Sequence, residues 1–373
     1  MYFSLTALVR LCALLGLVAS ASAIGLSRTV PKAAAYHVGG VPRYVGVNGI
    51  DLSPPRADSF LLDCATGGLT PFNPIRGHRV EFAAASPWNE EGGGELVARV
   101  TARDPVEGEA GDSSSLVHVP LSGGPIRREV PGAPLVEGRA CWLPGSHSRV
   151  VFPGGDGVLY VQDLTADDPA GADRPGSPPR PITWKTRRPG GGTISLADPV
   201  CPPIPALGGR LFVALSHGRE RETSQLAAAQ IWWLKLGPDG FSIVDAGPLT
   251  PESRALGDER PEERFPSLGV APDGRIVMTF LTREIASRSW RLNIAPIESF
   301  GADRPPIVRP SEIRSLTDGS SATPPAFSTD GQSLYLVTRN ALPDGGHVRQ
   351  VSLVEALSIA PTQQARFASQ TTR

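Results

Sequence analysis

The 373-residue chain lacks any long apolar-periodic helical stretch beyond its N-terminal segment. It contains instead 41 Gly and 38 Pro, roughly twice the average usage of these two residues, and they interrupt short apolar runs throughout. Many short strands joined by tight turns need this pattern, so the sequence predicts an all-β protein. Disorder would also explain such a composition, but the six Trp, twelve Phe and repeated β-branched runs argue against it.

Three motifs that carry chemistry or modification are also missing. No Gly-x-Ser-x-Gly nucleophile elbow occurs, which excludes a serine peptidase of the α/β-hydrolase type. The six His never form a short-range pair such as His-x-x-x-His, so the sequence contains no local metal motif and implies no cofactor. None of the five Asn stands in an Asn-x-Ser/Thr sequon, so N-glycosylation is not expected.

The N-terminal residues 1–23 have the pattern of a cleaved signal peptide. Arg10 supplies the charge, residues 11–18 the apolar run, and Ala21-Ser22-Ala23 the small-residue cleavage site. The run is too short to span a membrane comfortably, and no Cys follows it as in a lipoprotein. We therefore expect a secreted protein, or a periplasmic one if the source is a bacterium, without a membrane span.

Positive and negative charges nearly balance in the mature chain. Cleavage after residue 23 removes one base and no acid, which leaves 35 bases against 37 acids and a net charge of −2. No basic excess would draw the protein to nucleic acid or to an anionic membrane.

A phrase of two apolar strands around an Asp-Gly turn occurs twice. Residues 324–337 contain it around Asp330-Gly331, and residues 266–277 around Asp273-Gly274. Asp-Gly between apolar runs is a strong hairpin signal, because both residues accept positive φ. The turns also explain Asp273 and Asp330, whose side chains can accept hydrogen bonds from nearby backbone N–H groups.

This phrase resembles the repeat of TolB-like β-propellers, a WD-repeat-like architecture, and the resemblance covers residues 60–355. Weaker copies lie upstream, and the residues after the five turns are spaced by 54, 61, 65 and 57 positions, the length scale of propeller blades. With the strands at 44–72, the five units indicate a six-bladed ring, although five or seven blades stay compatible. A terminal strand that completes the blade made by the other end would close such a ring.

The predicted organisation has four parts. Residues 1–23 are the signal peptide, 24–42 a loose leader, 43–357 a single propeller, and 358–373 a flexible tail. Within the propeller, the Pro/Gly-rich and charged stretches 104–115, 165–192 and 251–263 are expected to be surface connections.

Charged residues directly precede the predicted inner strands. In a propeller these positions gather at one mouth of the central channel, which makes them a candidate binding site. The candidates are Arg79, Arg139, Asp198, Glu263 and Arg264. The alternative is that these side chains only link neighbouring blades.

The resemblance implies a non-catalytic scaffold that binds a protein or a polysaccharide, since TolB proteins dock a partner peptide at the channel mouth. The alternative is a carbohydrate-active enzyme, either a glycosidase or a lyase similar to the TolB-like oligogalacturonate lyases, with His and acids assembled from several blades. Two carboxylates at glycosidase distance, or three His, at the mouth would distinguish it.

Three Cys remain in the mature chain, namely Cys64, Cys141 and Cys201. Cys141 and Cys201 occupy nearly equal places in consecutive units, at the start of predicted inner strands. Because inner strands approach most closely, we predict a Cys141–Cys201 disulfide and a free Cys64. Three reduced thiols are the competing possibility.

Overall fold

The computed structural model describes side chains over residues 139–143, 149–163, 179–186, 194–216, 229–249, 261–283, 290–299, 301, 304–317, 325–328, 331–335 and 350–358, and elsewhere only the backbone of strands. Within this part the regular structure is almost entirely β. The exceptions are two 3-10 turns, Pro205–Leu207 and Pro310–Glu312, and the short helix α2, Leu353–Ser358. Among the described residues, no helix is both long and apolar enough to cross a membrane.

The described strands form six sheets, each built from neighbouring segments of the chain. The first sheet contains β1 (Ala35–His37), β2 (Tyr44–Asn48), β3 (Ser59–Asp63) and β4 (Leu69–Phe72), and the second contains β5 (His78–Ala85), β6 (Glu95–Ala102), β7 (Ser114–Pro120) and β8 (Arg128–Glu129). The third contains β9 (Cys141–Trp142), β10 (Arg149–Pro153), β11 (Leu159–Asp163) and β12 (Arg180–Pro181), and the fourth contains β14 (Ile194–Val200), β15 (Leu211–His217), β16 (Gln230–Leu236), β17 (Ser242–Pro248) and β13 (Thr183–Trp184). The fifth contains β18 (Glu262–Val270), β19 (Ile276–Arg283), β20 (Arg291–Ile297) and β21 (Arg314–Ser315), and the sixth contains β22 (Ala326–Phe327), β23 (Ser333–Arg339) and β24 (Gly346–Ser352).

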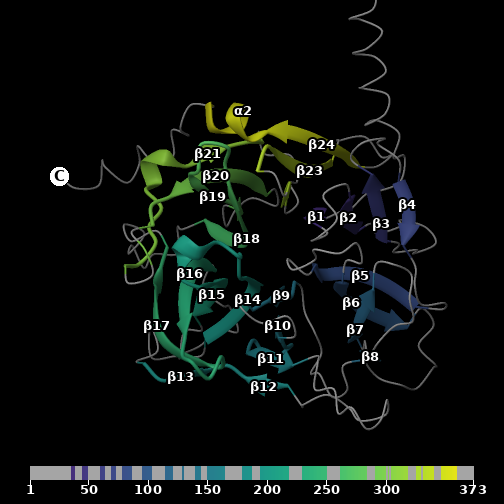
Figure 1. Cartoon of the computed structure of the whole chain (residues 1–373), viewed down its shortest axis with the longest axis vertical. Coiled ribbons are helices and arrows are strands. Elements are labelled where there is room, and N and C mark those ends of the chain that lie inside the picture. The colour runs from purple at the N-terminus through teal and green to yellow at the C-terminus, as the bar shows by residue number, and fades with distance from the viewer. Residues whose placement is uncertain are drawn as a thin grey trace, which may run out of the picture.

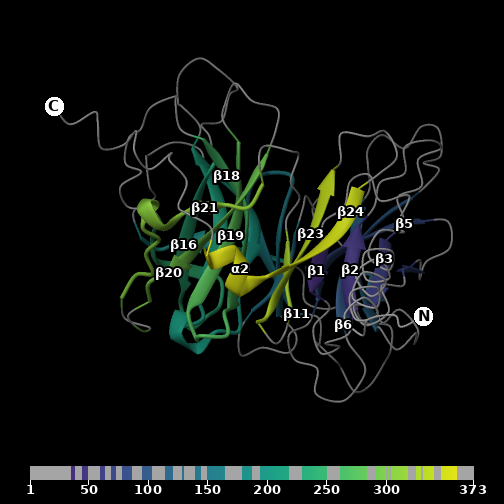
Figure 2. The ribbon, with the colours of Figure 1, turned by 90° about the horizontal axis from the view of Figure 1, so that it is seen from above.

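The first strands of the sheets contact one another in a closed cycle. The order is β1, β5, β9, β14, β18 and β22, and β22 contacts β1 again. The sheets therefore stand in a ring around a common centre, and the N-terminal and C-terminal sheets lie side by side (Figures 1 and 2). A ring of up-and-down sheets is the arrangement of a β-propeller, so the all-β propeller predicted from the sequence is confirmed at this level.

The way the ring closes differs from the prediction. Within the described strands, no sheet combines strands from both ends of the chain. Contacts of β1 with β22 and β23 join the two ends instead. β1 itself lies inside residues 24–42, the stretch expected to be a loose leader, so the first sheet begins earlier than the repeat pattern indicates. The predicted signal peptide lies outside the described residues.

Two further expectations need correction. β12 and β13 lie inside 165–192, expected to be a surface connection. β12 pairs with β11 of its own sheet, whereas β13 pairs in parallel with β17 of the next, so this segment ties two sheets together at their outer edges. The sequence also places the third unit's inner strand at Cys201. The structure places this strand at β14, which ends at Val200, so Cys201 follows it.

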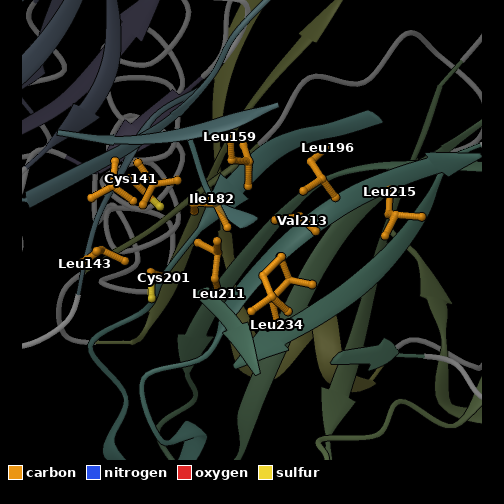
Figure 3. Close-up of a cluster of buried hydrophobic side chains, with 13 residues drawn as sticks. Cys141, Leu143, Leu159, Ile182, Leu196, Cys201, Leu211, Val213, Leu215 and Leu234 are labelled. Atoms are coloured by element: carbon orange, nitrogen blue, oxygen red, sulfur yellow. The ribbon is translucent and has the colours of Figure 1, made fainter. Parts of the chain in front are cut away.

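Apolar side chains fill the spaces between neighbouring sheets, and strand alternation divides them. In β15, Leu211, Val213 and Leu215 pack into the core between the third and fourth sheets (Figure 3). Phe212, on the opposite face of β15, packs into the core between the fourth and fifth sheets. Because both faces are buried, the central strands read as continuous apolar runs, as strands covered on both faces require.

One turn design recurs four times in the described part. A glycine with φ between 67° and 82° donates its N–H to the carbonyl three residues earlier, at 2.8–3.1 Å. The turns span residues 154–157, 237–240, 271–274 and 328–331, and each ends in Asp-Gly. In the third, Asp273 Oδ1 accepts from the N–H of Arg275 at 3.0 Å, which confirms the structural role predicted for Asp273. The side chain of Asp330 lies outside the described residues.

The predicted disulfide is not formed, since Cys141 and Cys201 are both free and buried. The two residues are neighbours, as predicted, and both belong to the core between the third and fourth sheets (Figure 3). The Cys201 thiol donates to the carbonyl oxygen of Arg210 at 3.2 Å. Burial raises the pKa of each thiol well above its ordinary value. Cys64 lies outside the described residues.

Candidate functional site

Charged and aromatic side chains gather around Phe265 at the beginning of the inner strand β18. They come from the third, fourth and fifth sheets and from residues just before their strands, so residues far apart in sequence meet there. We name this group the Phe265 cluster; its members are Arg139, Asp198, Glu262, Arg264, Phe265, Arg283 and Trp290.

Two backbone irregularities position the cluster. Asp198 in β14 and Phe265 in β18 have φ values of 50° and 54°, and both precede a proline. Each lies where the pairing of its inner strand with the next strand shifts register. The Phe265 N–H donates to Asp198 Oδ2 at 3.2 Å, which satisfies a donor that the shifted ladder leaves free. Non-glycine residues at positive φ are strained, and such strain concentrates at functional sites.

Asp198 and Arg264 form the central ion pair. Arg264 Nε donates to Asp198 Oδ2 at 2.6 Å, and its Nη2 lies 3.4 Å from Oδ1. The Asp198 side chain is only 1% exposed, so its charge depends on this partner. Burial alone would lower the pKa of the Arg264 guanidinium. The charges of Asp198 and Glu262 together raise this pKa by more than burial lowers it, so it lies above its ordinary value. The pair links β14 to β18 and therefore joins two neighbouring sheets.

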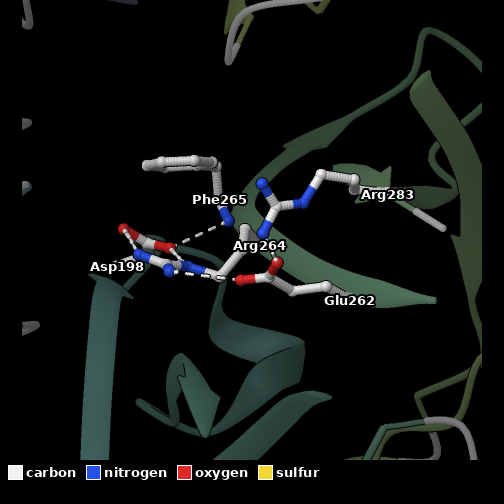
Figure 4. Close-up of polar contacts among 5 residues, drawn as sticks. All are labelled: Asp198, Glu262, Arg264, Phe265 and Arg283. Atoms are coloured by element: carbon white, nitrogen blue, oxygen red, sulfur yellow. Dashed lines mark hydrogen bonds and ion pairs between the residues drawn. The ribbon is translucent and has the colours of Figure 1, made fainter. Parts of the chain in front are cut away.

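Glu262 joins a second guanidinium to the cluster. Its carboxylate lies 3.5 Å from Arg264 Nη1 and accepts a hydrogen bond from Arg283 Nη2 (Figure 4). The guanidinium of Arg283 stacks over Trp290, with 4.7 Å between its carbon and the ring centroid. The ring of Trp290 meets Phe265 edge to face, with centroids 6.3 Å apart and an interplanar angle of 71°.

Two guanidiniums, those of Arg264 and Arg139, face the Phe265 ring itself. The guanidinium carbon of Arg264 lies 5.1 Å from the ring centroid, and that of Arg139 lies 5.8 Å from it. Both distances are within the range of cation–π attraction. Phe265 thus holds the cationic groups of two sheets together through its negative ring faces.

The structure brings together only some of the site residues that the sequence predicts. Arg139, Asp198 and Arg264 meet around Phe265, and their place at a channel mouth stays a prediction. Glu263 turns away, since its Oε2 accepts from the N–H of Ile231 at 3.0 Å and its own N–H donates to the carbonyl of Ala229. The side chain of Arg79 lies outside the described residues.

Sequence reasoning missed Glu262, Phe265, Arg283 and Trp290. Strand alternation was the available signal for Glu262, because residues 262 and 264 of one strand share a face and residue 263 takes the other. The register of β18 with β19 places Glu262 directly opposite Arg283.

Every described carboxylate of the site accepts at least one hydrogen bond. Asp198 accepts from a guanidinium and a backbone N–H, Glu262 from a guanidinium, and Glu263 from a backbone N–H. Within the described residues, no three His, Cys, Asp or Glu side chains are grouped to hold a metal ion. All six His side chains lie outside the described part. The chemistry that the described cluster can perform is the recognition of an anion by guanidinium groups.

Comparison with known proteins gives no family. No family model matches the chain, and no curated relative does. Solved structures of similar shape include the β-propeller domain of Cps50 (Swd1) from Myceliophteria thermophila (TM-score 0.46, 13% identity, covering 87% of this chain and 88% of that one). Another is the PQQ-bound aldose sugar dehydrogenase from Streptomyces coelicolor (TM-score 0.43, 14% identity, covering 87% of this chain and 96% of that one). A third is an oligogalacturonate lyase from Vibrio parahaemolyticus (TM-score 0.41, 11% identity, covering 88% of this chain and 93% of that one). At these scores the propeller assignment rests on the sheets themselves.

Proposed function

We propose that this protein is a secreted, six-bladed, TolB-like propeller that binds a partner protein and has no catalytic apparatus of its own. The six sheets and the closed cycle of their first strands support the blade number. The signal-peptide pattern of residues 1–23 supports export, to the periplasm if the source is a bacterium. A rigid disc of this kind presents loops and strand ends from many parts of the sequence on one surface.

The observation that carries the proposal is the pairing within the Phe265 cluster. The Asp198 carboxylate is only 1% exposed and accepts hydrogen bonds from Arg264 and from the Phe265 N–H, so it is poorly placed to reach a substrate as a general acid or base. A guanidinium that stays partly exposed in such a network remains available to a ligand. The arrangement therefore favours binding over turnover.

Affinity capture from the organism's own secretome and cell-wall fraction tests the proposal. The bait is the mature chain, residues 24–373, and the control bait carries Arg309→Gln, which removes an exposed ion pair with Glu298 away from the cluster. We expect the two baits to retain the same protein, at stoichiometric amounts and after washing in moderate salt. Release of oligosaccharides from cell-wall polymers by the purified chain, with no protein retained, would instead identify an enzyme.

A further inference from the structure

Arg283 and Trp290 lie at the end of the fifth sheet opposite the 271–274 turn. Arg283 closes β19 opposite Glu262, and Trp290 immediately precedes β20. The Arg283 guanidinium contacts Glu262 on one side (Figure 4). The indole of Trp290 lies on its other side, so the guanidinium plane is fixed while 41% of the Arg283 side chain remains exposed. A guanidinium that is held in place before binding loses little conformational entropy when it binds.

The pair has hydrogen-bond donors to spare. A guanidinium carries five N–H donors, and the contacts of Arg283 with described residues use only its Nη2, on Glu262. The indole N–H of Trp290 likewise has no acceptor among the described residues, and the ring is half-buried. Two parallel guanidinium N–H groups match the two oxygens of a carboxylate, and a neighbouring indole N–H can add a third hydrogen bond.

The charge around the pair also favours an anion. The side chains of Arg283 and Arg264 are 41% and 29% exposed, whereas those of Glu262 and Asp198 are only 17% and 1% exposed. A ligand that reaches these two ion pairs therefore meets more guanidinium surface than carboxylate surface.

The geometry points to an acidic segment of a partner protein, whose Asp or Glu carboxylate binds Arg283 and Trp290. This inference rests on the proposed function and names the chemistry of the partner. A sugar ring would need a free aromatic face for stacking, but the guanidinium of Arg283 covers one face of Trp290 and the edge-to-face contact with Phe265 restricts the ring further. A carboxylate needs only hydrogen-bond donors, and the remaining N–H groups of Arg283 and the indole N–H of Trp290 have no acceptor among the described residues.

Fluorescence anisotropy with labelled poly-L-glutamate measures this site in the mature chain. Arg283→Gln removes the charge at similar size, Trp290→Phe keeps the ring and removes the donor, and Arg309→Gln is the matched control. We expect Arg283→Gln to weaken binding by about tenfold or more and Trp290→Phe by about threefold, with no change in the control. Binding should weaken as salt is added, and poly-L-glutamine should not bind.

Three results would overturn the inference: no binding of poly-L-glutamate, equal binding by Arg283→Gln, or tighter binding of polygalacturonate than of poly-L-glutamate through Arg283. Equal melting temperatures of the variants and the parent protein exclude misfolding as the cause of a loss. Secretome capture separates the two proposals. If wild type and Arg283→Gln retain the same partner equally, the scaffold function stands and the acidic-segment inference fails; if wild type retains none, the scaffold function itself fails.

Discussion

Gly331 and Gly274 end equivalent turns but have different surroundings, and substitution by Ala should separate local strain from packing between sheets. Their φ values are 67° and 82°. A Cβ at Gly274 would meet nothing within 4 Å, whereas a Cβ at Gly331 would lie under 3.0 Å from the carbonyl oxygen of Val270, at the end of β18 in the neighbouring sheet. That backbone atom cannot rotate out of the way as a flexible side chain would.

The expected free energies follow from these two facts. Positive φ costs an Ala about 1–2 kcal/mol, partly offset by the lower entropy of the unfolded chain, so Gly274→Ala should destabilise by about 1 kcal/mol. Gly331→Ala adds an overpacking cost of about 1–3 kcal/mol and should lose about 2–4 kcal/mol in total.

Urea unfolding of both variants, with unchanged m-values, measures the difference. Equal losses at the two positions would refute the packing of the sixth sheet against β18. A third variant, Gly274→Asn, should cost less than Gly274→Ala, because Asn tolerates the left-handed region better.

Three further outcomes are expected. Arg264→Met leaves Asp198 buried without its cation and should lower the free energy of unfolding by about 3 kcal/mol; a loss below about 1 kcal/mol in urea would mean that the pair contributes little. Because burial raises the pKa of Cys141 and Cys201, native protein at pH 8 should resist iodoacetamide, and mass spectrometry should find these thiols alkylated only after unfolding. Thiols that ionise more readily in the unfolded chain stabilise the fold fully below about pH 8.5 and progressively less above it. The melting temperature should therefore fall more steeply above that pH in wild type than in a Cys141→Ala/Cys201→Ala variant, and parallel curves would refute the linkage.

The sequence predicts the strands and turns well where local chemistry determines them. The Asp273-Gly274 turn forms as expected because Asp accepts a neighbouring N–H and Gly adopts positive φ. The segment 180–184 was predicted as loop because Pro and Gly surround it. Its strand character comes from pairing with two sheets, a tertiary effect that local composition does not record.

The candidate site could be predicted only in part for a related reason. Arg139, Asp198 and Arg264 were found because they lie near the beginnings of inner strands. Glu263 was chosen from the wrong face of its strand, an error that alternation would have avoided. Arg283 joins the site because the register of β18 and β19 places it opposite Glu262. Counting residues outward from the 271–274 turn predicts this pairing, provided that the one-residue bulge in β18 is included. The positive φ of Phe265 leaves no trace in the sequence.

Hydrogen exchange of the mature chain, alone and with its captured partner, tests the central claim most directly, that the protein binds through the face bearing the Phe265 cluster. The account predicts slower exchange of amides at residues 262–265, 283 and 290–291 in the complex, with no change at the 237–240 and 271–274 turns at the opposite strand ends. Protection of those turns, with residues 283 and 290–291 unchanged, would contradict it.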